Sequence, residues 1–338
     1  MNGLDAHERP PEEIRRVYKR LQKLPAKSLN LDKDVISTTD AEATNPGGDQ
    51  RDLRVLKTST ELWDIFAAFD PDTGASPKPS DWVAPHVYEE KDVPGLFIIP
   101  SFLSPKVQVH LIDCLFHRDL SLPTHKTNLD LHYDLLRPPS EESYFSLPSC
   151  TMYAPKDPNV HKPLTVRQVL EKKLRWMTLG GQYDWTAKQY PEEQPPPFPP
   201  DIAKLLSSLF PSFRAEAAIV NLFSPGDTLS LHRDVSESCD AGLVSISLGC
   251  DGIFLISTGE PSAEDGEVKT LALRLRSGDA VFMTGKSRFA WHGVPKIVEE
   301  TCPDYLRDWP ATAKGDCEQW RGWMAGKRVN LNARQMFE

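Results

Sequence analysis

The first third of the chain has the hydrophobic spacing of amphipathic helices. In residues 11–24 apolar side chains recur at intervals of three and four, which places them on one helical face: Ile14, Val17, Tyr18 and Leu21. Acidic residues begin this segment and basic residues end it, which suits the helix dipole. A second helix is predicted over residues 59–69, with Ser59 as its N-cap. Residues 26–58 have little periodicity, so we expect a tether or flexible loop there.

Beyond residue 90 the pattern changes twice. Residues 93–104 predict a strand, and residues 104–117 predict a helix. From about residue 215 onward, short segments alternate apolar and polar residues and are separated by Gly, Ser or Asp, as in LVSISLG at 243–249. Several strands at short spacing without intervening helices indicate an all-β sandwich or barrel. We therefore expect the C-terminal part to be the catalytic or binding module.

Composition limits the class of protein. Hydrophobic residues make up 39% of the chain and charged residues 26%, as in soluble globular proteins. No apolar run approaches the ~20 residues of a membrane span, and the acidic N-terminus resembles no leader. We therefore expect no membrane contact and a place in the nucleus or cytoplasm, with the mitochondrion left open. The six cysteines are scattered without a C-x-x-C pair, which favours reduced thiols over a zinc knuckle or disulfide framework. The net charge of −9 argues against a broad phosphate-binding surface but permits a local basic strip.

The segment NLFSPGDTLSLHRDVSE at 221–237 carries a candidate metal site. On a strand, His232 and Asp234 would point to the same face, because residues two apart do so. Non-heme Fe(II) oxygenases hold iron with two histidines and one carboxylate. Among the other histidines, His292 is the best placed, because it lies in a strand-like stretch of the β-rich part. A polar strand end without a metal is the alternative.

The C-terminal segment KRVNLNARQ alternates polar and apolar residues. A strand would place on one face its polar residues: Arg328, Asn330, Asn332 and Arg334. Two arginines facing the interior would be costly without an anion to bind. A dicarboxylate such as 2-oxoglutarate would satisfy them, since an arginine fork can hold a carboxylate. A solvated edge strand is the alternative if this segment is considered by itself.

Together these stretches resemble the AlkB family of Fe(II)/2-oxoglutarate dioxygenases, over about residues 90–338. The order H-x-D, distant His and R-x-N-x-x-x-R carries the resemblance. It implies an α+β, mainly β fold, with a double-stranded β-helix (jelly-roll) core, N-terminal helices and a nucleotide-recognition lid. It also implies an N-terminal helix and flexible extension over 1–85 and a dioxygenase domain over 86–338. The lid would span about 172–200 and the catalytic core about 215–338.

By position, the resemblance assigns roles to the site residues. The Fe(II) ligands would be His232, Asp234 and His292. The contacts to 2-oxoglutarate would come from Asn221, Arg328, Asn330 and Arg334, with Arg334 on the distal carboxylate, and O2 would be the other co-substrate. Where the family usually has a tyrosine, this chain has Phe223. The missing hydrogen bond, worth ~1.5–3 kcal/mol, would weaken co-substrate binding about tenfold or more.

Residues for the substrate are predicted in RWMTLGGQYDW and beside the H-x-D segment. Trp176, Tyr183 and Trp185 fall in the lid, and Trp176 matches the residue that stacks on the methylated base. Aromatic core residues are the alternative. Glu237 matches a carboxylate that positions substrate, with a solvated turn residue as the alternative. The basic residues at 172–175 and 286–288 would form either a rim for phosphates or a solvated face.

The function expected from the resemblance is oxidative demethylation of methylated adenine in nucleic acid. The targets would be N1-methyladenine in tRNA, or N6-methyladenine in DNA or RNA including mRNA, in a single strand or as a flipped base. The products would be formaldehyde, succinate and CO2, and we expect a monomer. Two alternatives stay open. A methylated histone tail suits the acidic charge, and Phe223 motivates a nucleic-acid-binding module without turnover.

Overall fold

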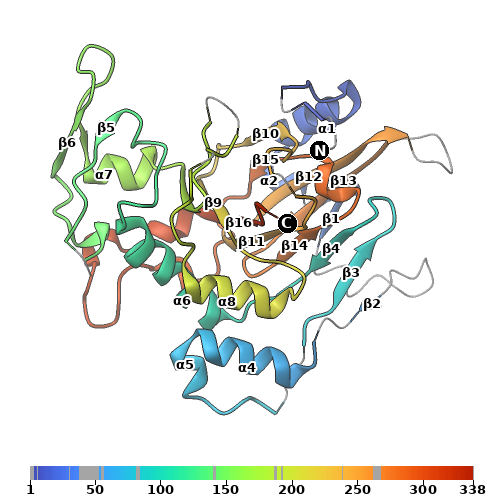
Figure 1. The fold of residues 1–338 in the computed structure, drawn as a ribbon, viewed down its shortest axis with the longest axis horizontal. Helices are drawn as coiled ribbons and strands as arrows, with labels where there is room; N and C mark the ends of the chain where they lie inside the picture. Colours follow the sequence, from blue (N-terminus) through green and yellow to red (C-terminus); the bar gives the residue numbers. More distant parts are fainter. Residues whose placement is uncertain are drawn as a thin grey trace.

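Two facing β-sheets form the centre of the molecule, and helices lie around them (Figure 1). This computed structural model describes residues 4–337 except 6, 30, 38–52, 55–56, 81–83, 140–141, 186–188, 192, 238 and 262–267, and only the backbone of 53–54 and 259–261. Within each of these two sheets, the described neighbouring strands pair antiparallel, except that β1 pairs in parallel with β13. The predicted α+β, mainly β fold with a jelly-roll core is confirmed.

The larger sheet contains the strand that ends the chain. In spatial order its strands are β2 (Leu53–Arg54), β3 (Val87–Glu90), β4 (Leu96–Ile99), β14 (Ala280–Met283), β11 (Leu243–Gly249), β16 (Arg328–Arg334), β9 (Ala217–Phe223) and β8 (Trp176–Gly180). The smaller sheet has the order β1 (Val35–Ser37), β13 (Val268–Leu275), β12 (Gly252–Pro261), β15 (Trp291–Ile297) and β10 (Leu229–His232). The part after residue 215 is therefore rich in strands, as its alternating pattern predicted.

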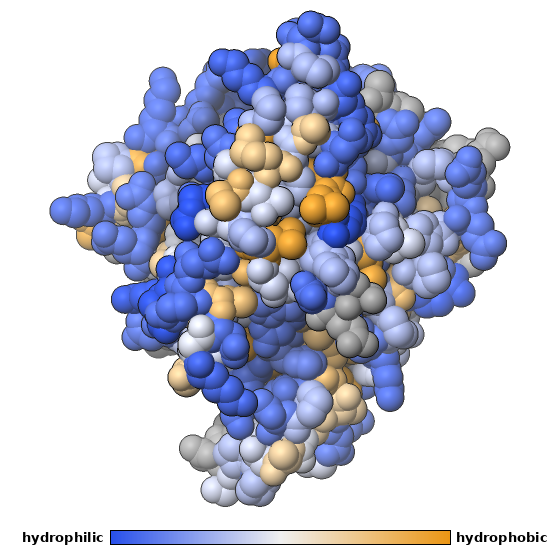
Figure 2. Space-filling view, turned by 90° about the vertical axis from the view of Figure 1, so that its left-hand side faces the viewer, coloured by the Kyte–Doolittle hydropathy of each residue, from blue (hydrophilic) through white to orange (hydrophobic). Residues whose placement is uncertain are grey.

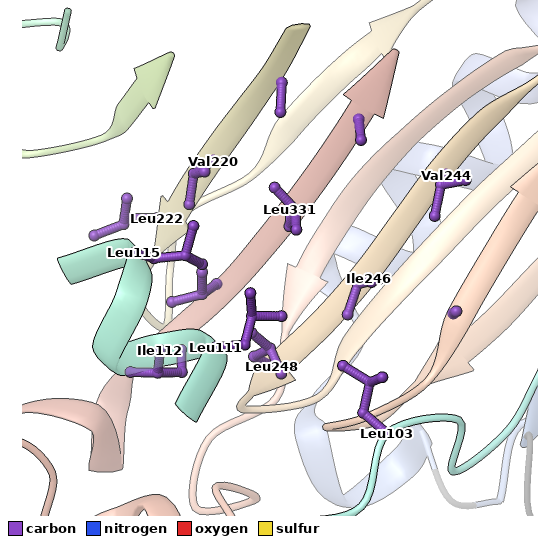
Figure 3. Packing of buried hydrophobic residues seen from close by; sticks show 14 of the residues in the cluster. Leu103, Leu111, Ile112, Leu115, Val220, Leu222, Val244, Ile246, Leu248 and Leu331 are labelled. Atoms are coloured by element: carbon purple, nitrogen blue, oxygen red, sulfur yellow. The ribbon is translucent and has the colours of Figure 1, made fainter. Parts of the chain in front are cut away.

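Helices cover the outer face of the larger sheet. α6 (Pro105–Asp113) lies where the sequence predicted a helix, begins after Ser104 and continues into a π-helical turn at Cys114–Arg118. In Figure 3, Leu111 and Leu115 point toward Val220 on β9 and Leu331 on β16. α8 (Pro200–Leu209) and α4 (Ser59–Phe69) pack beside it. The apolar face of β16 is thus buried in this core, which leaves its polar face for the space between the sheets.

The N-terminal helix packs on the smaller sheet. α1 (Glu12–Lys23) confirms the helix predicted from the spacing of its apolar residues. Ile14 and Leu21 are fully buried in one cluster with Leu255 on β12 and Trp291 on β15. The hydroxyl of Tyr18 donates to the main-chain oxygen of Leu229 at 3.1 Å. α1 therefore contacts both strands that lead to the predicted metal ligands.

Two predictions for the first third of the chain were wrong in detail. Residues 26–58 are not a continuous loop, because they contain α2 (Ala26–Leu29), β1 and β2, although 38–52 lie outside the described residues. The N-cap of α4 is Thr58 and not Ser59. Thr58 Oγ1 accepts from the backbone of Glu61 at 3.2 Å, and the Glu61 carboxylate accepts from the backbone of Thr58 at 2.8 Å. This reciprocal pair requires Glu three residues after the cap, which only Thr58 has.

A third, small sheet lies at one side of the molecule (Figure 1). It consists of β5 (Tyr133–Asp134), β6 (Met152–Pro155) and β7 (Leu164–Thr165), and the short helix α7 (Val166–Gln168) follows it. The strand predicted over 93–104 is shorter, because a turn at Gly95 (φ +85°) precedes β4. Among the described helices, none is long and apolar enough to cross a membrane.

Candidate metal centre

The three predicted metal ligands lie together at one end of the smaller sheet. His232 ends β10 and is the register partner of His292 on β15. Asp234 Oδ1 lies 3.7 Å from Nε2 of His232, and its Oδ2 lies 3.8 Å from Nε2 of His292. One ligand atom from each residue can be chosen such that all lie within 4.8 Å of one another. The prediction that these residues come together is therefore supported by the geometry, although Asp234 lies beyond the strand end.

Both imidazoles are oriented as metal ligands require. The Nδ1 atom of His232 lies 2.8 Å from the main-chain oxygen of Ser230, and Nδ1 of His292 lies 3.0 Å from that of Ala290. With the proton on Nδ1, each Nε2 lone pair faces Asp234. Burial lowers the pKa of His292 to about 4, which keeps the ring neutral as a ligand must be. Two imidazoles and one carboxylate form the donor set of non-heme Fe(II) sites.

Arg334 lies beside the metal ligands. Its Nη2 donates to Oδ2 of Asp234 at 2.8 Å, and its Nε lies 3.0 Å from Glu237 Oε1. Burial opposes ionisation of Asp234, but the Arg334 guanidinium, with Arg288 as a further positive charge, outweighs it and holds the pKa of that carboxyl well below its usual range. The resemblance assigns Arg334 to the distal carboxylate of 2-oxoglutarate, whereas the structure pairs this residue with a predicted metal ligand. Because it pairs with a metal ligand, any anion it contacts lies at the metal end.

Arg328 is buried at the opposite end of β16. Its Nη2 donates to Ser247 Oγ at 2.8 Å and its Nη1 to the main-chain oxygen of Cys250 at 3.4 Å, but its Nε has no hydrogen-bond partner. Burial lowers the pKa of this guanidinium to about 10. Gly252 leaves room for it, since a Cβ there would lie 2.6 Å from Nε of Arg328. A buried guanidinium with a free N–H fits an anion such as a carboxylate.

The space between the two arginines is lined by polar side chains of the larger sheet. Asn330 donates to Ser245 Oγ at 2.8 Å and to the main-chain oxygen of Ile246 at 3.1 Å. Asn221 is its register partner on β9, and Phe223 is the register partner of Arg328. The alternating residues Val329, Leu331 and Ala333 are fully buried in the opposite face. The predicted inward polar face of this strand is therefore confirmed.

The lid aromatics form a cluster next to the metal loop. Trp176, on edge strand β8, is the register partner of Asn221. Its ring centroid lies 5.0 Å from that of Trp185, which lies 4.9 Å from that of Tyr183. The hydroxyl of Tyr183 lies 3.3 Å from Ser236 Oγ, two residues after Asp234. The cluster therefore reaches from the sheet edge to the segment that carries a metal ligand.

A cavity of about 750 Å³ opens beside these aromatics. Its lining combines the aromatic residues Trp176, Tyr183 and Trp185 with residues from 126–136 and with polar side chains such as Lys156 and Asp184. Leu131 and Leu136 in this lining are 60% and 61% exposed. Figure 2 shows the side of the molecule on which β5 and β6 lie in Figure 1, where hydrophobic residues gather in the upper half within a hydrophilic surround. A cavity of this size, with aromatic rings in its lining, can take one nucleobase with its neighbours.

Glu237 and Arg288 do not face the substrate side as predicted. The Glu237 carboxylate is 3% exposed and is held by Arg288 at 2.8 Å and by Arg334 at 3.0 Å. Arg288 is buried, so it cannot form a phosphate rim, whereas Lys172, Lys173 and Lys286 are exposed. The sequence cannot show this pairing, because residue 237 meets residues 51 and 97 positions away only in the fold.

Tyr190 is a site residue that the sequence analysis missed. Its ring centroid lies 5.3 Å from that of Tyr183, and burial among these groups raises its pKa. Arg334, Glu237 and Asp234 are the charges that act on its hydroxyl. The residue lies at the start of the proline-rich stretch 190–200, within the range predicted for the lid. An aromatic residue spaced within ten positions of Tyr183 and Trp185 was the available signal.

The chain is similar to known proteins over part or all of its length. The sequence profile described as "2OG-Fe(II) oxygenase superfamily" matches residues 95–334. A protein of Pyricularia oryzae named "N6-methyladenosine RNA demethylase ALKB1" is 45% identical over 100% of this chain and 99% of its own length. The "tRNA demethylase abh1" of Schizosaccharomyces pombe is 40% identical over 75% of this chain and 83% of its own. The "DNA N(6)-methyladenine demethylase ALKBH1A" of Arabidopsis thaliana is 37% identical over 50% of each chain.

Proposed function

Since the chain belongs to the 2OG-Fe(II) oxygenase superfamily and, within it, to the AlkB family, we propose that it is an oxidative demethylase of methylated adenine in nucleic acid. The observation that carries the proposal is that the ligand atoms of His232, Asp234 and His292 lie within 4.8 Å of one another, with Arg334 donating to Asp234. The buried Arg328 lies at the other end of β16, and Tyr183 of the aromatic cavity contacts Ser236, two residues after Asp234. The site thus offers three ligands for a metal ion, a buried arginine for an anion and an aromatic cavity for a base.

The residues divide the work of binding. His232, Asp234 and His292 would hold Fe(II), and Arg334 keeps Asp234 ionised. Arg328, with Asn221 and Asn330 beside it, would hold the distal carboxylate of 2-oxoglutarate. When bound, iron with 2-oxoglutarate and O2 supplies the oxidation that hydroxylates an N-methyl group, with release of succinate and CO2. The hydroxymethylated amine then loses formaldehyde and leaves the unmodified base.

The aromatic cluster supports a base that is outside a duplex. A base paired within a helix cannot reach a metal between two sheets, so it must be flipped or belong to a single strand. Trp176 and Trp185 present ring faces on which an unstacked base can lie, and Tyr183 links them to the metal loop. The relative aligned over the full chain favours N6-methyladenine in RNA, and the Schizosaccharomyces relative favours tRNA.

Two other functions follow from particular observations. The net charge of −9 favours a basic protein tail, such as a methylated histone, at the same site. Phe223 lies opposite Arg328 where the resemblance implies a tyrosine, which favours a binding module without turnover. With either function, the three metal ligands would still bind Fe(II) and Arg328 would still bind 2-oxoglutarate.

The test measures succinate and formaldehyde from purified protein with Fe(II) and 2-oxoglutarate. Substrates are RNA and DNA with N6-methyladenine, a tRNA stem-loop with N1-methyladenine, and a methylated histone peptide. His232→Ala should abolish both products, and His86→Ala, which changes an exposed histidine, should not. Formaldehyde from the peptide alone would contradict the proposal in favour of a protein substrate. No succinate above background from any substrate would support the binding module.

A further inference from the structure

One metal ligand lies in a segment that no strand fixes. β10 ends at His232, and Asp234 belongs to the stretch 233–242, which has no helix or strand among its described residues. Ligands must be held to within about 0.5 Å of their working position, so other contacts must fix this backbone. Arg288 makes them from the 3-10 turn Ser287–Phe289, which precedes the ligand strand β15.

Arg288 fastens this segment at three points. Its Nη1 donates to the main-chain oxygen of Asp234 at 2.7 Å. Its Nη2 donates to the Glu237 carboxylate at 2.8 Å, and its Nε donates to the main-chain oxygen of Ala241 at 3.0 Å. The Arg288 side chain is only 2% exposed, so the whole fork is used inside the protein. The three nitrogens of a planar guanidinium can reach acceptors that lie apart from one another, whereas a lysine ammonium donates from a single nitrogen and cannot span them.

Glu237 joins this clamp to Arg334. One carboxylate oxygen accepts from Arg288, and the other lies 3.0 Å from Nε of Arg334, whose Nη2 donates to Asp234 at 2.8 Å. Asp234 is thus held twice, by its main chain through Arg288 and by its carboxylate through Arg334. The two carboxylates balance the two guanidinium groups, so the cluster presents no net positive charge to a divalent cation.

We propose that Arg288 and Glu237 are positioning residues for the metal site. Arg288 fixes the backbone of Asp234, and Glu237 holds Arg288 and Arg334 in their places. The inference rests on the proposed function, because it takes the three ligands to bind Fe(II). It concerns metal affinity, which can be measured without a nucleic-acid substrate.

The experiment titrates the full-length protein with Fe(II) without oxygen and records thermal unfolding of the metal-free protein. Arg288→Lys keeps the charge but loses the fork, and Glu237→Gln keeps the shape but loses the charge. Each should raise the metal Kd about tenfold or more while metal-free unfolding stays cooperative. Lys286→Gln changes an exposed charge beside the same turn and should leave the Kd within about twofold.

If Arg288→Lys does not fold, Glu237→Gln still tests whether the cluster positions the metal ligands, because glutamine has nearly the same volume as glutamate. An unchanged metal Kd in folded Glu237→Gln would overturn the proposal. Loss of cooperative unfolding in both variants would also overturn it, since the cluster would then serve folding alone. Wild-type protein that binds no Fe(II) would instead contradict the proposed function.

Discussion

Arg334 donates from Nη2 to Oδ2 of Asp234 at 2.8 Å, so the last arginine of the chain is paired with a predicted metal ligand. Arg328, six residues earlier on the same strand, lies about 20 Å away along the backbone. The side chains can approach each other only by reaching inward from opposite ends. The two arginines therefore cannot bind the same group.

Replacing Arg328 should affect the co-substrate and not the metal. Arg328→Gln removes the buried positive charge whose Nε has no protein partner, and the metal ligands stay in place. A lost charge-assisted pair of ~3 kcal/mol should raise the KM for 2-oxoglutarate about 100-fold. The Kd for Fe(II) should stay within about twofold, because none of the ligand contacts involves this residue. A parallel loss of metal affinity would contradict the division of roles, and exposed Arg214→Gln is the control.

Because Gly252 has no side chain, it leaves the space in which the Arg328 side chain lies. In Gly252→Ala the new methyl group would start 2.6 Å from Nε and 2.9 Å from Cδ of Arg328, so the guanidinium must move. We expect the KM for 2-oxoglutarate to rise about tenfold, as a displaced binding group implies. Gly326→Ala is the matched control, because a Cβ there meets no atom within 4 Å. Equal KM values for the two variants would show that Arg328 does not hold the co-substrate.

Adding a hydroxyl at residue 223 should strengthen co-substrate binding. Phe223 is buried and is the register partner of Arg328, so Phe223→Tyr directs a hydroxyl toward the same anion. A further hydrogen bond to a charged group, worth ~1.5 kcal/mol, should lower the KM for 2-oxoglutarate about tenfold. Phe213→Tyr, another buried phenylalanine, should leave KM unchanged. A KM that does not fall would mean that the anion lies elsewhere, or that Phe223 already suits it.

The sequence could predict the parts of the site that depend on local spacing. The H-x-D triplet and the alternation of β16 follow from residues a few positions apart, and the strand-like context of His292 is also local. The fold class followed from many short alternating segments after residue 215, where the described helices are at most four residues long. Such patterns survive because side-chain direction in a strand is fixed by its period of two.

Contacts between distant segments could not be predicted. In the sequence, Glu237 is typical of an exposed turn residue. Only the approach of Arg288 and Arg334 in the fold places its carboxylate in a buried ion pair. The strand β1 is three residues long and pairs in parallel with β13, which lies more than 200 positions later. The pairing of Arg334 with Asp234 could not be predicted for the same reason, since spacing along β16 does not say which end meets the metal ligands.

The N-terminal helix should contribute to the stability of the whole catalytic unit. Leu21 is fully buried against the smaller sheet, so Leu21→Ala should lower the free energy of unfolding by about 2–5 kcal/mol. Denaturant unfolding of the full-length protein measures this change, and exposed Lys19→Ala should alter it by less than about 0.5 kcal/mol. If Leu21→Ala left the free energy of unfolding unchanged, the helix would be an independent extension, as the predicted domain boundary at residue 85 implies.

The lid tryptophans should set affinity for the nucleic acid and leave the oxidative chemistry intact. The ring centroids of Trp176 and Trp185 lie 5.0 Å apart beside the cavity, whereas the two arginines and the two histidine ligands lie on other strands. Losing one stacked ring costs ~1–3 kcal/mol per base, so Trp176→Ala and Trp185→Ala should each raise the KM for a methylated oligonucleotide about tenfold. Succinate released without any nucleic acid should not change, because co-substrate binding does not use these rings. Tyr305→Ala is the control, since Tyr305 is 42% exposed and Trp185 41%. A fall in succinate release to match the loss of demethylation would place the tryptophans in the support of the metal site and not in substrate recognition.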